Sequence, residues 1–379
     1  MIEIGVLGST GSVGTQVLDI VRKNKDQIKV KLLGASKLSE KLLSQIEEFK
    51  PDYVYVENGN ISESIKNTKV FLGEESLDFL KDLKLDLFII AIAGVKGIRP
   101  TYLLLESNKK VATANKEAII CLGELEKGKY KNIIPIDSEH SAIFQVIDRR
   151  PLDDIRRIIL TASGGPFLNL PLEELKNVSI QQTLNHPRWS MGKKISVDSA
   201  TLINKGFEVI EAHYLFDIPY EKIDVVIHPE SIIHGMVEYI DGTVIANLSN
   251  PDMRIPISYA IFYPERKYIN NNYLDFTKLK SLNFLSPDYE KFPLLKVAIE
   301  CGKKAGVYPT ALTMADEVAV NLYLQGKIKF LDIYKIVIEV VESIKDYSIN
   351  NIQDLLDFID YVEKYSLSVA KKYGSSWLS

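Results

Sequence analysis

Four side chains able to do chemistry stand together in the stretch Asp137-Ser138-Glu139-His140, directly after the apolar run at 134–136. In an extended segment alternate side chains point the same way, so Asp137 and Glu139 are predicted to share one face. Two carboxylates that close repel each other, and a hard divalent cation between them removes the repulsion. Taken alone, such a motif is more often a solvated turn. A metal site here therefore needs a third ligand from another part of the chain.

A candidate for the third carboxylate is Glu208, in a stretch from Ser199 to Glu211 that predicts one helix. Asn204, Lys205 and Glu208 are three or four residues apart and share a face of that helix. Spacing alone favours a surface ion pair between Lys205 and Glu208. It also leaves Glu211 open as the third carboxylate.

A predicted loop at 184–194 contains His186, Trp189, Met191 and three basic residues. A large apolar ring on such a loop suits a lid that closes over a ligand and expels water. The alternative is a loop that Trp189 anchors to the core.

Two consecutive glycines follow Ser163, directly after the predicted strand at 158–160. Their backbone N–H groups could form a nest for an anion, with the Ser163 hydroxyl as a further donor. A plain turn is an equal alternative for this motif.

The elements that must position these residues begin with a strand at 2–7, the loop Gly8-Ser-Thr-Gly11-Ser-Val-Gly14 and an amphipathic helix. A strand, a glycine turn and a helix in this order bind the pyrophosphate of a dinucleotide at the helix N-terminus. The second strand, at 30–35, is followed by Ser36 and Lys37, where NAD-preferring enzymes usually have an acidic residue. A hydroxyl and a cation suit a 2′-phosphate, so the sequence predicts NADP(H).

Further strands are predicted at 53–56, 86–93, 111–113 and 132–136, with a helix at 39–49. This alternation predicts an α/β fold whose N-terminal domain, residues 1–137, is a doubly wound Rossmann-type NADPH domain. Lys116 and the Asp137 motif would lie at one rim of that sheet, at the carboxyl ends of its strands.

A strand at 224–228 and a hairpin around Asp241-Gly242 predict a central α/β catalytic domain over 138–262. A polar linker at 263–289 leads to a predicted C-terminal helical bundle over 290–379. The bundle helices are predicted at 294–304, 311–324, 331–344 and 352–372.

Composition narrows the class of protein. The 379 residues, 46% hydrophobic and 25% charged, are typical of a soluble protein of two or three domains. A net charge of -4 argues against nucleic acid or an acidic membrane as partner, and no run approaches the roughly 20 apolar residues of a membrane span. Cys121 and Cys301 are interpreted as buried thiols, and His213 and His228 as structural histidines. The chain begins with a strand-like segment rather than a signal peptide, so we expect a cytoplasmic protein.

With these stretches in view, the chain resembles the 1-deoxy-D-xylulose 5-phosphate reductoisomerase family. The resemblance covers nearly the whole chain, in family order. Its motifs are GSTGSVG at 8, ANKE at 114, PIDSEHSAIFQ at 135, ASGGPF at 162, HPRWSMGKKISVDSATLINKGFEVIEA at 186, HPESIIHGMVEY at 228 and PDMRIPI at 251.

The resemblance implies NADPH- and metal-dependent isomerisation and reduction of 1-deoxy-D-xylulose 5-phosphate to 2-C-methyl-D-erythritol 4-phosphate, by a homodimer. It implies Mg²⁺ or Mn²⁺, with Co²⁺ as a further candidate, on Asp137, Glu139 and Glu208. The implied NADPH contacts are Thr10, Gly11, Ser12, Val13, Asn115, Glu117 and Gly192, to which Ser36 and Lys37 are added from the second strand. Substrate contacts are Lys116, Ser138, Glu139, Ser163, His186, Ser199, Asn204, Lys205 and Glu208, with Trp189 as a cover. Of these, Lys116, Glu139 and His186 are the candidates for proton transfer.

Two departures from the family pattern stand out. The family commonly has Gly, a basic residue and Asn after the second strand, where this chain has Ser36-Lys37-Leu38. The family's Asn-Ala-Ala-Asn-Glu run is here Thr313-Met-Ala-Asp316-Glu317.

Two rival functions remain open at this point. One is a semialdehyde-type NADP-dependent dehydrogenase, which would need an activated cysteine that neither Cys121 nor Cys301 resembles. The other is a non-catalytic NADP(H)-sensing module, which has no need for three convergent carboxylates or a lid.

Overall fold

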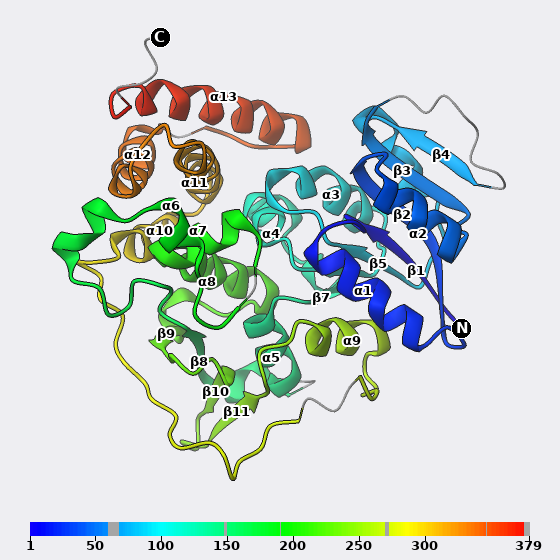
Figure 1. Ribbon diagram of the computed structural model, residues 1–379, viewed down its shortest axis with the longest axis horizontal. Coiled ribbons are helices and arrows are strands. Elements are labelled where there is room, and N and C mark those ends of the chain that lie inside the picture. Colours follow the sequence, from blue (N-terminus) through cyan, green and yellow to red (C-terminus); the bar gives the residue numbers. More distant parts are fainter. Residues whose placement is uncertain (60–67, 148–149, 190, 270–272, 346, 375–379) are drawn as a thin grey trace. The chain divides into compact units, whose positions relative to one another are not determined.

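The computed structural model describes residues 1–59, 68–147, 150–189, 191–269, 273–345 and 347–374 (Figure 1). The chain forms two compact units: unit 1 is Met1–Ala118, Glu126–Ser141 and Asp252–Asn271, and unit 2 is Ile119–Leu125, Ala142–Pro251 and Asn272–Ser379. Ser190 of the predicted lid, residues 270–272 of the predicted linker and residues 375–379 of the predicted bundle lie outside the described residues. Within the described ranges no helix is both long and apolar enough to span a bilayer.

Unit 1 is built on a seven-stranded parallel sheet in the order β4-β3-β2-β1-β5-β6-β7. Its strands are β1 (Ile2–Leu7), β2 (Ile28–Lys37), β3 (Tyr53–Asn58), β4 (Lys69–Leu72), β5 (Leu87–Ile90), β6 (Val111–Thr113) and β7 (Ile133–Pro135). After β4 the chain crosses to the other side of β1, which creates the switch point where doubly wound sheets bind ligands. The predicted Rossmann-type fold is confirmed, and β4 is an edge strand that the sequence analysis missed.

Helices cover the sheet of unit 1. They are α1 (Ser12–Lys23), α2 (Glu40–Phe49), α3 (Ile98–Glu106) and α9 (Arg254–Phe262), with α4 (Lys116–Leu122) and α5 (Ser138–Ile147) leading on into unit 2. Ile4 and Val6 of β1 and Ile89 of β5 pack with α1, α2 and α9 in one buried cluster. The residues next to them in β1 and β5, on the opposite face of the sheet, are also buried. A strand covered on both faces is almost continuously apolar.

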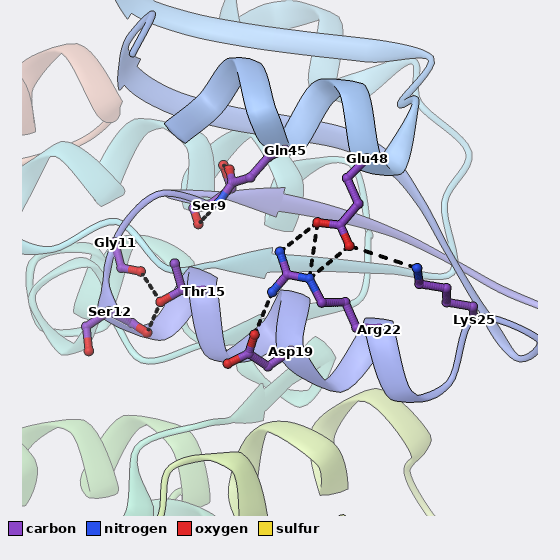
Figure 2. Close-up of polar contacts among 9 residues, drawn as sticks. All are labelled: Ser9, Gly11, Ser12, Thr15, Asp19, Arg22, Lys25, Gln45 and Glu48. Atoms are coloured by element: carbon purple, nitrogen blue, oxygen red, sulfur yellow. Dashed lines mark hydrogen bonds and ion pairs between the residues drawn. The ribbon is translucent and has the colours of Figure 1, made fainter. Parts of the chain in front are cut away.

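Helices α1 and α2 are joined at the surface by Arg22, which donates to both Glu48 oxygens and to Asp19 (Figure 2). This pairing holds the pKa of the Glu48 carboxyl below its usual range. Ser39 caps α2 by accepting from the Leu42 backbone N–H at 3.3 Å.

Unit 2 contains a four-stranded mixed sheet in the order β11-β10-β8-β9. Its strands are β8 (Ile155–Ala162), β9 (Ile223–Ile227), β10 (Ile233–Tyr239) and β11 (Val244–Leu248), and β8 and β9 are parallel while the other pairs are antiparallel. The predicted hairpin is confirmed, because the Gly242 N–H donates to the Tyr239 carbonyl and Gly242 has a positive φ of 85°.

The helices of unit 2 include a central one, α8, whose side chains are buried along most of its length. The set is α6 (Ile180–Leu184), α7 (Lys193–Thr201), α8 (Ile203–Phe216), α10 (Pro293–Lys304), α11 (Tyr308–Leu324), α12 (Phe330–Ser343) and α13 (Ile352–Ala370). Helices α8 and α10 approach closely at Gly206, where a Cβ would lie 2.3 Å from the Ala298 Cβ. The four predicted C-terminal helices are confirmed.

Short 3-10 helices fill several connections. They are η1 (Glu74–Lys81), η2 (Gly94–Gly97), η3 (Gly123–Glu126), η4 (Tyr130–Asn132), η5 (Leu152–Asp154), η6 (Leu172–Asn177) and η7 (Tyr220–Lys222). Within unit 2, Leu285 of the predicted linker exchanges two backbone hydrogen bonds of 2.9 Å with Ile227.

Candidate functional site

The glycine loop of unit 1 is held by backbone hydrogen bonds. The N–H groups of Gly8 and Ser9 both donate to the Gly34 carbonyl of β2, at 2.8 and 2.9 Å. A Cβ on Gly14 would lie 2.3 Å from the Gly8 carbonyl oxygen, so only glycine fits there. The loop is therefore a tight turn at the carboxyl end of β1.

Helix α1 begins within the glycine motif. Its N-cap residue is Gly11, which has no side chain to cap the helix. The first turn of α1 consists of the neutral residues Ser12, Val13, Gly14 and Thr15, and Thr15 donates back to the carbonyls of Gly11 and Ser12 (Figure 2). Gly11 and Ser12 are exposed. A helix N-terminus of this kind suits a dinucleotide pyrophosphate, so the residues fit the predicted cofactor.

Ser36 and Lys37, predicted to follow the second strand, are its last two residues, since β2 is longer than predicted. Both are exposed at its carboxyl end, as a contact with a bound ribose phosphate requires.

Asn115 and Glu117 are both buried. The Asn115 amide donates to the carbonyls of Ile92 and Gly94 at 2.7 Å each and accepts from the Ala118 N–H at 2.6 Å. Its side chain therefore shapes the end of β5 and the start of α4, and its contact with the cofactor stays a prediction.

Asp137 and Glu139 do not alternate on a strand as predicted. The strand β7 ends at Pro135, and Ser138 and Glu139 lie in the first turn of α5. The Asp137 carbonyl accepts from the Ser141 N–H at 2.8 Å, as an N-cap residue does. The correction follows from this cap: the chain turns into a helix as soon as it leaves the sheet.

Lys116 lies 2.6 Å from Asp137, between its Nζ and a carboxylate oxygen. Lys116 starts α4 and Asp137 precedes α5, so the ends of the adjacent strands β6 and β7 meet as predicted. The side chains are 5% and 13% exposed, which makes this an ion pair of the interior. Ser138 donates to Glu139 beside it.

The predicted helix from Ser199 to Glu211 is two helices. Leu202, with a positive φ of 59°, separates α7 from α8, so Ser199 lies in the last turn of α7 and Asn204 in the first turn of α8. Glu208 accepts from Lys205 and, at 2.6 Å, from the Asn204 amide, as the spacing predicted. The pair is not at the surface, however: Lys205 is 3% exposed and Glu208 is 1% exposed.

His186 and Ser163 meet in unit 2, with 2.9 Å between Nε2 and Oγ. His186 Nδ1 accepts from the backbone N–H groups of Arg188 and Trp189, at 3.2 and 2.9 Å. This fixes the neutral tautomer with its proton on Nε2. Burial lowers the pKa of His186 to about 4. Its predicted role as a proton carrier is therefore less favoured than a role as a neutral hydrogen-bond donor.

The glycines after Ser163 bring this corner together. Gly164 and Gly165 have positive φ angles of 85° and 69°, and the Gly165 N–H donates to Ser163 Oγ at 3.2 Å. A Cβ on Gly165 would lie 2.5 Å from the Ser199 carbonyl oxygen. Ser163, His186 and the Ser199 turn are thus neighbours in the fold of unit 2.

The predicted lid has anchors at both ends. Trp189 packs edge-on against His234, Arg188 donates to the Pro229 carbonyl at 2.9 Å, and Gly192 is the N-cap residue of α7. The contact of Trp189 matches the anchored-loop alternative, and closure over a ligand stays a prediction.

A buried charge cluster of unit 2 was missed by the sequence analysis. Lys194, in the first turn of α7, lies 2.6 Å from Asp198 and 2.8 Å from Asp316 of α11. Both carboxylates are almost fully buried. The i, i+4 spacing of Lys194 and Asp198 was a readable signal, whereas nothing in the sequence joins them to Asp316.

Comparison with known proteins places these residues in a family. Profiles of 1-deoxy-D-xylulose 5-phosphate reductoisomerase match residues 4–123, those of its C-terminal domain match 133–216, and those of the DXP reductoisomerase C-terminal domain match 248–365. A 1-deoxy-D-xylulose 5-phosphate reductoisomerase of Sulfurihydrogenibium sp. (strain YO3AOP1) is 66% identical over 99% of this chain and 100% of its own length. One of Persephonella marina is 59% identical over 98% and 99%. The chain belongs to the 1-deoxy-D-xylulose 5-phosphate reductoisomerase family.

Solved structures of the family have the same fold. A DOX-P reductoisomerase in complex with NADPH, fosmidomycin and magnesium superposes with a TM-score of 0.92, at 34% identity over 98% of each chain. The reductoisomerase of Zymomonas mobilis in complex with NADPH superposes with a TM-score of 0.90, at 35% identity over 97% of this chain and 98% of the other.

The burial of both cysteines argues against the activated, accessible cysteine that a semialdehyde dehydrogenase would need. Cys121 and Cys301 are both buried, and burial raises the pKa of Cys301 to about 12. A thiol with a raised pKa is a poor nucleophile.

Proposed function

We propose that this chain converts 1-deoxy-D-xylulose 5-phosphate to 2-C-methyl-D-erythritol 4-phosphate at a single site that takes NADPH and Mg²⁺. The chain is an NADP-dependent oxidoreductase of its family, and the observation that carries this function is the full-length family match. The residue roles below are our proposal. They are supported by the resemblance and by the local geometry of each unit.

For the cofactor, we assign Thr10, Gly11, Ser12 and Val13 to the pyrophosphate and Ser36 and Lys37 to the 2′-phosphate. The neutral, exposed N-terminus of α1 supports the first assignment, and the exposed end of β2 supports the second. Asn115, Glu117 and Gly192 are assigned to the nicotinamide half. NADPH bound there supplies the hydride for reduction.

For the metal, we assign Asp137, Glu139 and Glu208. Three carboxylates form the hard oxygen donor set that Mg²⁺ prefers, and Mn²⁺ or Co²⁺ would also accept it. The hydrogen bonds that this buried carboxylate of Glu208 accepts from Lys205 and Asn204 fix it in position. Mg²⁺ held there would act as a Lewis acid on the carbonyl and hydroxyl oxygens of the substrate.

For the phosphate of the substrate, we assign Ser163, His186, Ser199, Asn204 and Lys205. The Ser163 oxygen already accepts from the Gly165 N–H and faces the Nε2–H of His186. Its own hydroxyl proton is therefore the part left to donate, and a phosphate oxygen is a suitable acceptor. His186 needs no charge for this role.

For the reacting carbons, we assign Lys116, Ser138 and Glu139, with Trp189 as a cover that excludes water. Lys116 is an ammonium held against Asp137 in the interior, so it can hold a proton or a positive charge close to a developing oxyanion. Ser138 donates a hydrogen bond from the first turn of α5.

Two further proposals concern the whole protein. We expect a homodimer, as the family resemblance implies, and a cytoplasmic protein, as the sequence predicts. Sedimentation at micromolar concentration would test the oligomeric state.

The deciding experiment follows the absorbance of NADPH with 1-deoxy-D-xylulose 5-phosphate and Mg²⁺, with and without a chelator. We expect consumption of NADPH that stops on chelation and returns when Mg²⁺ is restored. Folded protein that consumes NADPH equally with and without chelator, or not at all, would refute the proposed function. Product identification by NMR separates reduction of this substrate from a side reaction.

A further inference from the structure

We propose that Lys41 is a second determinant of NADPH specificity and binds the 2′-phosphate together with Lys37. The proposal rests on the proposed use of NADPH and concerns unit 1 alone. Lys41 lies in the first turn of α2, and its Nζ donates to the Thr10 carbonyl of the glycine loop at 2.8 Å. An exposed lysine of the second helix is thereby held against the loop to which the cofactor phosphates are assigned.

The same face of α2 is fixed to the loop one turn further on. Gln45, four residues after Lys41, is buried and makes two hydrogen bonds with Ser9 (Figure 2). Ser9 Oγ donates to Gln45 Oε1 at 2.8 Å, and Gln45 Nε2 donates to the Ser9 carbonyl at 3.0 Å. Residues four apart lie on one helix face, so this paired contact fixes the direction in which Lys41 points.

The position of Lys41 suits the 2′-phosphate. In a Rossmann-type fold, residues beyond the carboxyl end of the second strand contact the 2′ position of the adenosine ribose. Lys37 ends β2, Ser39 caps α2, and Lys41 stands in the turn that follows. The two lysines therefore flank the short connection between β2 and α2.

The chemistry of Lys41 is complementary to a phosphate. An ammonium has three donors, and the bond to the Thr10 carbonyl uses one of them. Leu38, which stands where the family commonly has Asn, offers no hydrogen bond. A second cation, in the first turn of α2, makes up for that missing donor.

The alternative is that Lys41 only braces the glycine loop. A brace would support every dinucleotide equally, because the pyrophosphate of NADH and NADPH is the same. A 2′-phosphate contact supports NADPH alone. The comparison of phosphorylated and unphosphorylated nucleotides therefore separates the two roles.

The experiment compares the full-length protein with Lys41→Met, Lys41→Arg and Lys37→Met, and uses Lys50→Met as a control. Lys50 is an exposed lysine at the other end of α2. Calorimetry measures the affinity for 2′,5′-ADP and for 5′-AMP, and kinetics measure kcat/KM for NADPH and NADH. The melting temperature of each variant checks its fold.

We expect Lys41→Met to weaken 2′,5′-ADP about tenfold, the size of one charge-assisted hydrogen bond, with 5′-AMP unchanged. Lys41→Arg should retain most of the affinity and Lys50→Met all of it. Lys37→Met should show a loss of the same kind. Equal losses for both nucleotides would show a brace, and no loss for either would show a surface lysine; each result overturns the proposal.

The binding measurement needs no turnover. If the protein did not reduce 1-deoxyxylulose 5-phosphate but Lys41→Met still lost affinity for 2′,5′-ADP selectively, the proposed function would fail while this inference stood. If the protein reduced 1-deoxyxylulose 5-phosphate normally but Lys41→Met kept the wild-type preference for 2′,5′-ADP over 5′-AMP, this inference would fail while the proposed function stood.

Discussion

The glycine loop of unit 1 and helix α8 of unit 2 are both assigned to phosphate groups, and α8 also to the metal, but they are built differently. The loop presents neutral backbone groups at an exposed helix N-terminus, held by bonds from Gly8 and Ser9 to Gly34. Helix α8 presents buried charged side chains, Lys205 and Glu208, which pair with each other. On the proposed assignments, the loop would bind its ligand through dipoles and α8 would bind through full charges.

The difference follows from what each region has to hold. A pyrophosphate can remain partly hydrated, so backbone dipoles are sufficient for it. A divalent cation beside a phosphate requires opposite charges at short range in a dry place. Lys205 and Glu208 neutralise each other in the interior, and a phosphate and a metal can each take over one partner of that pair. Charges at such a site must be supplied as pairs, since a single buried charge is costly.

The largest effect on activity is expected from Glu208→Gln. The change removes a charge and a metal ligand while it keeps the size of the side chain. We expect kcat/KM to fall more than about 100-fold. Mutating a residue that only orients a metal ligand usually costs up to about 100-fold, and losing the metal ligand itself should cost more. NADPH binding, measured by fluorescence, should remain within a factor of two because the loop of unit 1 is untouched.

Glu211→Gln is the matched comparison, because the sequence left Glu211 open as the third carboxylate. It is equally buried and lies on the same helix. We expect its activity to keep the wild-type dependence on Mg²⁺ concentration. If Glu211→Gln shifted that dependence and Glu208→Gln did not, the assignment of the metal ligand would move to Glu211.

The second effect concerns Lys194 and tests whether buried charges in unit 2 depend on their partners. Lys194→Met takes the ammonium from the buried carboxylates of Asp198 and Asp316. We expect a loss of about 3 kcal/mol in the free energy of unfolding, the lower end for breaking a buried pair. Asp316→Asn leaves Lys194 paired with Asp198 and should cost only about 1 kcal/mol.

Urea denaturation of both variants, followed by circular dichroism, measures these losses. Lys25→Met is a control from unit 1, where a mostly exposed lysine lies 3.9 Å from Glu48 and should contribute little. Equal losses in the free energy of unfolding for Lys194→Met and Lys25→Met would mean that the buried ion pairs of Lys194 stabilise the protein no more than the exposed one of Lys25.

The sequence predicted the glycine loop of unit 1 better than the buried charges of α8 in unit 2. Local patterns predicted the glycine loop and the parallel sheet, because a tight turn needs glycine and a strand covered on both faces needs apolar residues throughout. The cation at the end of β2 could likewise be read directly from the sequence. The spacing of Asn204, Lys205 and Glu208 was also sufficient to predict that these side chains meet.

Burial and helix boundaries were harder to predict. Nothing local shows that Lys205 and Glu208 are inside, because helix spacing is the same for a surface pair. The break at Leu202 depends on a positive φ in a residue that rarely adopts one. The turn into α5 at Ser138 was hidden by the apolar run before it, which continues the pattern of a strand. Asp316 meets Lys194 across 122 residues, a contact that only the tertiary fold decides.

The smallest effect is the pH dependence that His186 adds to stability. Its pKa is lowered from 6.5 to about 4 by burial, and its Nδ1 accepts two backbone N–H groups. Between pH 4 and 6.5 the unfolded chain therefore binds more protons at this residue than the folded protein does. The free energy of unfolding should fall as the pH decreases through this window, and the contribution is fully retained only above pH 6.5.

His186→Asn tests this, because the asparagine oxygen can accept the same backbone N–H groups without titrating. The melting temperatures of both proteins, measured from pH 7 to pH 4, should converge toward low pH as the wild type loses its advantage. Parallel curves would show that His186 is protonated in the folded protein near its ordinary pKa. A histidine of that kind would carry a charge to the phosphate, and unit 2 would then bind its anion with one more full charge than we propose.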